Sequence, residues 1–590
     1  MQVYPRVRHS AFWALAAASV LLSGCGGHMN PENRTTRYGD VEGVNDSARS
    51  GTYFWKGIPF AQAPVGALRW KAPRAPLAWT GTRDAKTFGA SCIQNPRLYS
   101  PGNSNTFDAS VGQNLISGNT PGSEDCLSLN IWRPASGERN LPVIVFIHGG
   151  SNITGYSGDP MYDGAALANK ANAVVVTANY RLGQLGHFRH PALRDTTVDP
   201  TLTADDMSGN YAVLDIVQAL RFVQDNVDEF GGNPKNVTLT GQSAGAINVL
   251  AVATAPGQRA AGLFHKLAPL SGGISVANSP GFPQPANNLV GNHGYIPALN
   301  PSATYDALSG ALLAKLLIDD GSAADAASAT AWIAGHSNAD IAAYLRGKPA
   351  STLLKVGVRT IGGLPNTTTS GPIPEGTVVA TDPIAAILAG NYVKTPLLAG
   401  LTGAENKLLS FFLPLVGHPV GIKLTDAQLF PILFDPAKAK AAKFGDIINP
   451  AYPDVAAYDP AIAELDAKFF GALRDNMLNA FIKQTPDQVW SYRFDWKQEP
   501  APWNDVYGAA HAFDLAFLLG NFDTSLYANV IASDANKGGR DALSGAMMGA
   551  LGAFARSGNP NDASLGTNWP TWPRVLVFDA SQTGKQISVE

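Results

Sequence analysis

The sequence predicts an α/β fold with a large, mostly parallel central sheet. Three continuous apolar runs, "LPVIVFIHGG" (141–150), "AVVVTANYR" (173–181) and "NVTLTG" (236–241), are typical of strands buried on both faces of a parallel sheet. A segment with helical spacing of its apolar residues, 211–227, lies between the second and third runs. Strands that alternate with helices along the chain indicate this fold class.

The other elements follow in order along the chain. Residues 39–132 mix short strands with loops, and "HKLAPLSG" and "TPLLAGLTG" supply further strands of the sheet. Residues 275–380 are alanine-rich and contain helical segments such as "YDALSGALLAKLLID", which we expect to be inserted over the sheet as pocket walls. No linker divides the chain, so residues 36–590 are expected to form one catalytic domain.

The composition narrows the classes of function. Lys and Arg total 43 against 46 Asp and Glu, for a net charge of −3, and no basic run indicates a nucleic-acid partner. No P-loop is present, and no G-x-G-x-x-G follows a strand. His187 and His190 lack the further ligands that a metal site needs. We therefore expect neither a metal nor a cofactor.

The first 25 residues have the features of a signal peptide. A basic start precedes an apolar run, 11–22, that is too short to span a bilayer. The run ends in "LSGC", which resembles a bacterial lipobox, so we expect cleavage before Cys25, lipidation of Cys25 and a tether over 26–35. The alternative is an ordinary secretory signal cut nearby. Either way the protein is expected to be exported, as a periplasmic or outer-membrane-anchored lipoprotein or secreted, with the lipid as its contact with a membrane.

Two further cysteines, Cys92 and Cys126, remain in the mature chain. In an exported protein such a pair is usually a disulfide. It would close a loop of about 35 residues and stabilise the fold by roughly 3–4 kcal/mol on the chain-entropy model. The alternative is a pair of buried free thiols.

The motif "GQSAG" places Ser243 at a sharp turn between a strand and a helix. This is the form of a nucleophile elbow, in which the strained turn exposes the serine hydroxyl above the sheet. Gly241 and Gly245 avoid collisions with the neighbouring strand and helix. Ala244 begins the helix, where its N–H favours a developing negative charge.

A nucleophilic serine needs a histidine base. The chain has ten histidines, of which His265, His293, His336, His418 and His511 follow the serine. The segment "VYGAAHAFDLAFLLG" places the last of these in a glycine-containing loop that runs into a helix, which is the setting of a loop-borne base. His511 is therefore the predicted base.

Four long segments resemble the type-B carboxylesterases, the α/β-hydrolase group that includes the cholinesterases. They are "YFWKGIPFAQAPVGALRWKAP", "SEDCLSLNIW", "ALRFVQDNVDEFGGNPKNVTLTGQSAGA" and "GAAHAFDLAFLLG". The resemblance covers about residues 36–590. It implies an α/β-hydrolase fold and a triad in the order serine, acid, histidine.

The resemblance also supplies residues that the pattern alone does not choose. It implies that Glu405, after the strand "TPLLAGLTG", is the acid, and that Ser271 in "PLSGG" is hydrogen-bonded near the acid. Asp514 lies three residues after His511, but the acid in this fold precedes the histidine. We expect Asp514 to cap or charge the first turn of its helix.

Backbone N–H groups of Gly150, Ser151 and Ala244 are the implied oxyanion hole. Ser151 departs from the family, which has a third glycine there, and Gln242 replaces the usual glutamate before the nucleophile. The tryptophan with which cholinesterases bind choline has no counterpart in "QNLISGNTPG". Choline esters are therefore not expected as substrates.

Together these features predict a serine esterase that hydrolyses uncharged small-molecule carboxylic esters through an acyl-enzyme. The alternatives are a specialised esterase or amidase acting on bulky natural-product esters, or a cholinesterase-like binding protein without activity. Specificity lies in loops, so the sequence does not name the ester. It does not give the oligomeric state either.

Overall fold

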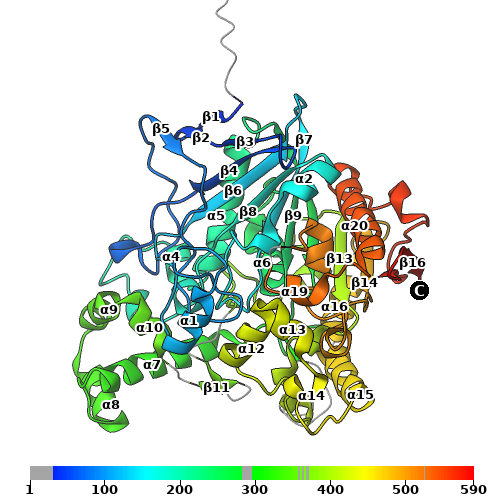
Figure 1. The fold of residues 1–590 in the computed structure, drawn as a ribbon. Helices are drawn as coiled ribbons and strands as arrows, with labels where there is room; N and C mark the ends of the chain where they lie inside the picture. Colours follow the sequence, from blue (N-terminus) through cyan, green and yellow to red (C-terminus); the bar gives the residue numbers. More distant parts are fainter. Residues whose placement is uncertain (1–30, 282–295, 357–358, 362–363, 367–370, 524) are drawn as a thin grey trace, which may run out of the picture.

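The computed structural model describes residues 31–281, 296–356, 359–361, 364–366, 371–523 and 525–590 (Figure 1). The predicted signal peptide and Cys25 lie outside these residues. Residues 33–35, predicted to end a tether, instead form part of β1 (Asn33–Thr36), which pairs with β2 (Gly39–Glu42). The folded domain thus begins slightly earlier than predicted. Within the described ranges, no helix has the length and apolar character that a membrane span requires.

The central sheet has 11 strands in the order β16-β15-β14-β13-β10-β9-β7-β8-β6-β4-β3. The strands from β15 to β8 in this order are parallel, and the strands at both edges are antiparallel. The predicted mostly parallel sheet is therefore confirmed. Its strands are β3 (Val44–Asp46), β4 (Thr52–Pro59), β6 (Ser128–Pro134), β7 (Leu141–Ile147), β8 (Val174–Ala178), β9 (Gly232–Gln242), β10 (Lys266–Leu270), β13 (Leu397–Thr402), β14 (Val489–Phe494), β15 (Leu576–Ala580) and β16 (Lys585–Val589).

Two short sheets accompany the large one. β1 and β2 are joined by β5 (Thr82–Asp84), and β11 (Arg359–Ile361) pairs with β12 (Leu364–Asn366). The helices of the first half of the chain are α1 (Ser110–Ser117), α2 (Ala165–Ala171), α3 (Gly183–Gly186), α4 (Ala204–Met207), α5 (Tyr211–Asn226) and α6 (Ala244–Ala253).

The helices of the second half are α7 (Ser302–Asp319), α8 (Ala326–Gly335), α9 (Asn338–Gly347), α10 (Ala350–Lys355), α11 (Pro383–Leu388), α12 (Asp426–Phe434), α13 (Pro436–Ala441), α14 (Phe444–Ile447), α15 (Val455–Asp466), α16 (Ala472–Ile482), α17 (Trp503–Val506), α18 (Asp514–Leu519), α19 (Ala528–Ile531) and α20 (Lys537–Ser557). A π-helical turn, Ala467–Gly471, joins α15 to α16.

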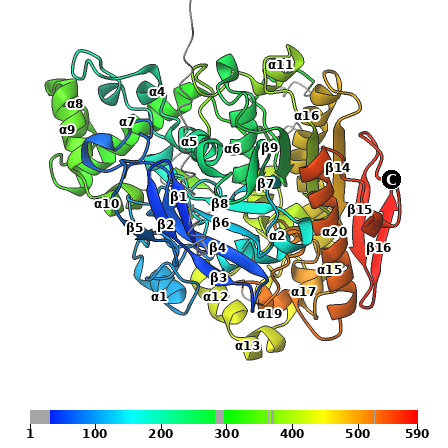
Figure 2. The same cartoon turned by 90° about the horizontal axis from the view of Figure 1, so that it is seen from above.

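The apolar runs are explained by burial on both faces of the sheet. Every residue of β7 is buried. Val143, Val145 and Ile147 face one core with α5, α6, α11 and α16, whereas Ile144 and Phe146 face the other core with α2, α18 and α20. Figure 2 shows α5, α6 and α11 on one side of the sheet and α2 and α20 on the other. A strand buried on both faces has no polar side to alternate with its apolar side.

The predicted insertion is helical in its described part, but it lies beside the sheet and not over it as expected. Helices α7 to α10 gather at the lower left of Figure 1, apart from the sheet. They surround a third core of their own, to which Leu312, Leu316, Leu345 and Leu353 contribute. Phe188, from the segment after β8, packs into the same core and so joins the insertion to the main domain.

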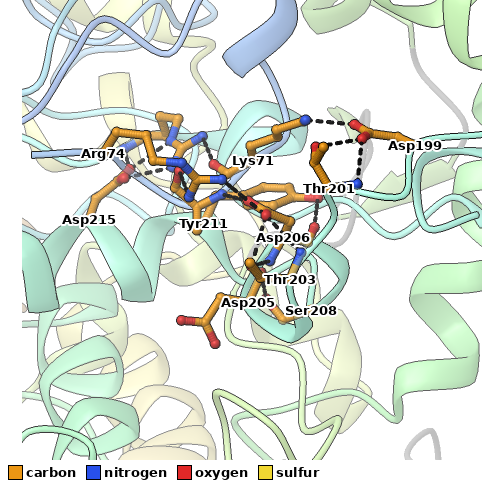
Figure 3. A network of polar contacts seen from close by, with 12 residues as sticks. Lys71, Arg74, Asp199, Thr201, Thr203, Asp205, Asp206, Ser208, Tyr211 and Asp215 are labelled. Carbon is orange, nitrogen blue, oxygen red and sulfur yellow. Dashed lines mark hydrogen bonds and ion pairs between the residues drawn. The ribbon is translucent and has the colours of Figure 1, made fainter. Parts of the chain in front are cut away.

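Polar contacts fix the segments that border the insertion. Figure 3 shows Lys71 and Arg74 reaching toward Asp199 and Asp206, with nitrogen–oxygen distances of 2.6 and 2.9 Å. Arg181 makes a buried bidentate pair with Asp215, at 2.8 and 2.7 Å. Removing one partner of a buried pair leaves an uncompensated charge and costs about 3–5 kcal/mol.

Candidate active site

Ser243 occupies the turn between the end of β9 and the start of α6. Its φ of 58° and ψ of −123° are rare for a residue with a side chain, so the predicted strain is confirmed. A Cβ on Gly241 would lie 2.5 Å from the Gly245 carbonyl oxygen, and one on Gly245 would lie 2.2 Å from that of Ile147. Both glycines are therefore required by close packing around the serine.

His511 and Glu405 are brought together although 106 residues separate them. Nδ1 of His511 lies 2.5 Å from Oε2 of Glu405, and both side chains are buried. The other carboxylate oxygen, Oε1, accepts a hydrogen bond of 2.7 Å from the Thr402 backbone N–H. Because a carboxylate only accepts, Nδ1 carries the proton and Nε2 keeps its lone pair.

Gln242 also belongs to the site. Its side-chain nitrogen lies 3.1 Å from Nε2 of His511. The described contacts include no hydrogen bond between the Ser243 hydroxyl and His511. Catalytic hydrogen bonds of this kind often shorten only when substrate is bound. The neutral amide is therefore in direct contact with the predicted base.

The predicted oxyanion loop follows β7 and packs against the serine. A Cβ on Gly149 would lie 2.9 Å from the Cβ of Ser243, so the loop backbone passes close to the nucleophile. Gly150 and Ser151 have φ values of 101° and 55°. Ala244 is the first residue of α6, where helical N–H groups have no partner within the helix.

The predicted hydrogen bond of Ser271 near the acid is not formed. Ser271 follows β10 with a φ of 49°, and its buried hydroxyl has no hydrogen-bond partner among the described residues. The hydrogen bond that the resemblance implied for Ser271 is therefore absent from the described contacts.

Asp514 lies in the first turn of α18, as predicted, but it does not cap the helix. Its carboxyl is buried and accepts a hydrogen bond of 2.7 Å from the Tyr492 hydroxyl. Burial raises the pKa of Asp514 to about 6. The described contacts pair His511 with Glu405 and not with Asp514.

Two residues near the triad were missed from the sequence. The ring of Phe470, in the π-helical turn, lies 5.1 Å from the His511 ring. Asp466 accepts hydrogen bonds from the backbone and side chain of Asn406, at 2.8 and 2.7 Å. Burial and the nearby Glu405 raise the pKa of Asp466 to about 8. Neither residue belongs to a local motif that could have revealed it.

The structure confirms the predicted disulfide. Cys92 and Cys126 are bonded, with 4.9 Å between their Cα atoms. Metal-binding residues do not gather: in the part of the chain that the structure describes, no group of three or more His, Cys, Asp or Glu side chains could hold an ion. Burial lowers the pKa of His187 to about 3 and that of His190 to about 4, which keeps both rings neutral.

Comparisons with known proteins agree with this geometry. The model of the carboxylesterase family matches residues 30–292 and 307–587. The para-nitrobenzyl esterase of Bacillus subtilis is 30% identical over 574 residues, covering 93% of this chain and 95% of that protein. The fumonisin B1 esterase of Sphingopyxis macrogoltabida is 30% identical over 566 residues, covering 93% and 87%. A crystal structure of the Geobacillus stearothermophilus carboxylesterase EST55 superposes with a TM-score of 0.65 at 29% identity, covering 95% of this chain and 98% of that one.

Proposed function

The chain belongs to the carboxylesterase family and is a carboxylic-ester hydrolase, and we propose that Ser243, His511 and Glu405 carry out the reaction on uncharged esters. The observation that carries this assignment is the 2.5 Å contact between His511 and Glu405 in the same site as the strained Ser243. A nucleophile, a base and an orienting acid are the three groups that acyl transfer by serine requires.

The reaction proceeds in two halves. Nε2 of His511 takes the hydroxyl proton of Ser243 as Oγ attacks the ester carbonyl, and Glu405 stabilises the imidazolium through Nδ1–H. The tetrahedral oxyanion accepts hydrogen bonds from the N–H groups of Gly150, Ser151 and Ala244. The alcohol then leaves with the proton from His511, and water attacks the acyl-enzyme by the same route to release the acid.

The side-chain nitrogen of Gln242 lies 3.1 Å from Nε2 of His511, so residue 242 is part of the immediate environment of the base. A neutral residue at position 242 also leaves the site without the carboxylate that would favour a cationic alcohol. The neutral side chain of Gln242 therefore supports uncharged esters as the substrate class.

A second candidate is an esterase specialised for bulky natural-product esters. The observation that favours it is the 30% identity over 93% of this chain with a fumonisin B1 esterase. A panel of p-nitrophenyl esters, fumonisin B1 and aryl amides distinguishes the candidates by their kcat/KM values. Amide turnover that matches ester turnover would favour an amidase instead.

Covalent labelling tests the triad itself. A fluorophosphonate probe should modify the native protein at Ser243, located by mass spectrometry of the labelled peptide. Ser243→Ala should not be labelled. Ser544→Ala, which removes a buried hydroxyl of α20 that donates to the Phe517 carbonyl of α18, should be labelled normally. Labelling at another serine, or none in active protein, would refute the assignment.

We also propose that the protein is exported as a lipoprotein, with the lipid on Cys25. The Cys92–Cys126 disulfide supports an oxidising compartment. Protein made in a bacterial host should partition into detergent and lose this behaviour on Cys25→Ala. A native protein that stays in the aqueous phase, with its N-terminus cut elsewhere, would remove the lipid anchor from the proposal.

A further inference from the structure

The oxyanion loop has a backbone conformation that must be held in place. Gly150, Ser151, Asn152 and Gly155 have φ values of 101°, 55°, 58° and 108°. Ser151 and Asn152 carry side chains, and each residue of that kind in the left-handed region costs on the order of 1–2 kcal/mol. Contacts elsewhere in the fold must outweigh this cost for the loop to keep its shape.

Gln94 makes such contacts with the far end of the loop. Its buried Oε1 accepts hydrogen bonds of 2.8 Å from the Thr154 hydroxyl and 2.8 Å from the Gly155 N–H. Its Nε2 donates to the carbonyl oxygens of Gly155, at 3.0 Å, and Cys92, at 2.8 Å. One side chain thus satisfies both backbone polar groups of Gly155 and uses its full hydrogen-bonding capacity.

Thr154 connects these contacts to the oxyanion donors. Its N–H donates to the Gly150 carbonyl at 3.1 Å. A Cβ on Gly150 would lie 2.2 Å from the Thr154 carbonyl oxygen, so the two backbones touch. A displacement of Thr154 therefore displaces Gly150, whose N–H is one of the proposed donors.

Gln94 is itself fixed by the disulfide-bonded segment. It lies two residues after Cys92, and its own N–H donates to the Pro121 carbonyl at 3.1 Å. The Cys92–Cys126 bond joins the same two stretches of chain. The oxyanion loop is therefore held by a segment that the Cys92–Cys126 disulfide cross-links.

We propose that Gln94 is a positioning residue that holds the oxyanion loop in its left-handed conformation. This inference rests on the proposed function, in which Gly150 and Ser151 donate to the oxyanion. Such donors work when they lie 2.7–3.1 Å from the oxyanion. A misplacement of about 1 Å costs up to about 10²-fold in rate.

Gln94→Ala tests the proposal, with Gln224→Ala as its matched control. Gln224 also binds two backbone carbonyls, those of Pro234 near the start of β9 and Leu263 before β10, at the opposite end of β9 from Ser243. We expect Gln94→Ala to lower kcat on a p-nitrophenyl ester by about 10- to 100-fold with little change in KM. Gln224→Ala should lower only the thermal midpoint.

An inhibitor separates positioning from general destabilisation. The Ser243 hydroxyl oxygen adds to the carbonyl of a trifluoromethyl ketone, and the adduct carries an oxyanion. The corresponding methyl ketone binds without forming this adduct. The Ki of the trifluoromethyl ketone should rise in Gln94→Ala by about the factor lost in kcat, and the Ki of the methyl ketone should not change. An unchanged kcat and unchanged inhibition, with only a lower thermal midpoint, would overturn the proposal.

Thr154→Val keeps the test decisive if Gln94→Ala does not fold. It removes one hydrogen bond and leaves the Gly155 N–H paired with Gln94. We expect kcat to fall about fivefold, the equivalent of one neutral hydrogen bond, and a wild-type kcat would overturn the proposal. Failure of the proposed function is a separate result: the trifluoromethyl ketone would then bind Ser243→Ala as tightly as it binds the wild type.

Discussion

The side-chain nitrogen of Gln242 lies 3.1 Å from Nε2 of His511, the nitrogen that has to accept the proton of Ser243. A carboxylate at this position would face the same nitrogen. The carboxylate would attract a protonated ring, whereas the amide of Gln242 donates a hydrogen bond to the neutral ring. The charge of residue 242 should therefore control the protonation of His511.

Gln242→Glu should shift the acid limb of the pH–rate profile upward. Its carboxylate stabilises the protonated imidazole of His511, and activity needs the neutral ring, so the rate falls at a higher pH than in the wild type. The kcat/KM for cationic esters should also rise relative to that for neutral esters, because opposite charges attract more strongly where water is partly excluded. Profiles of kcat/KM against pH for a neutral and a cationic ester check both effects. Identical profiles would show that residue 242 does not act on the base.

Ser243→Ala should abolish ester hydrolysis without unfolding the protein. Loss of the triad nucleophile costs on the order of 10⁴–10⁶ in kcat. The measurement is turnover of a short p-nitrophenyl ester by protein with a native thermal transition. Turnover near that of the wild type in the absence of contaminating esterase would contradict the mechanism.

Glu405→Gln and Asp514→Asn should have opposite phenotypes. The first removes the acceptor of the His511 Nδ1 proton and should lower kcat by about 10³–10⁴. The second changes the partner of the Tyr492 hydroxyl and should act mainly on the thermal midpoint. If Asp514→Asn instead lost most of the kcat while Glu405→Gln lost only stability, the acid would be Asp514.

Asp466→Asn should flatten the dependence of stability on pH. The pKa of Asp466 is raised from 3.8 to about 8, so the folded state holds a proton that the unfolded chain has already lost at intermediate pH. The contribution of Asp466 to the free energy of unfolding is therefore complete below about pH 4 and is lost as the pH rises through about 8.

Thermal midpoints measured from about pH 5 to pH 9 check this prediction. The decline of the thermal midpoint between about pH 5 and pH 8 should be smaller in Asp466→Asn than in the wild type. Asp487→Asn, which changes an exposed carboxylate, is the matched control and should follow the wild-type curve. A wild-type curve in Asp466→Asn would mean that this carboxyl ionises normally.

Loss of the disulfide should destabilise the domain. Cys92→Ala/Cys126→Ala frees a loop of about 35 residues in the unfolded chain, which lowers the free energy of unfolding by roughly 3–4 kcal/mol. Denaturant unfolding of the purified variant measures this. An unchanged midpoint would indicate that the surrounding contacts alone close the loop.

The sequence was most informative where structure is decided locally. Strands β7, β8 and β9 were predictable because burial on both faces leaves a continuous apolar run, and Ser243 was predictable because its two glycines are neighbours along the chain. Glu405 was different: the contact with His511 spans 106 residues, and 46 acidic residues were available, so only a family resemblance could select it.

The failed prediction for Ser271 has a related cause. Its position along the chain was clear, but the surroundings of its hydroxyl depend on the folded arrangement, in which that hydroxyl has no partner among the described residues. The contacts of Gln94 likewise join residues about 60 positions apart. Which distant donors and acceptors meet is settled only by the folded arrangement.

The last strand of the sheet has a practical consequence for handling the protein. β16 is rich in exposed side chains and covers one edge of β15, a largely buried strand, and the Glu590 carboxylate binds Arg493 at 2.6 Å. A shortened chain that ends before Lys585 would present the open backbone of an apolar strand, and such edges recruit other chains into aggregates. Affinity tags at this end should therefore be added after Glu590 through a flexible spacer, so that residues 585–590 stay paired with β15 and keep its edge covered in concentrated solution.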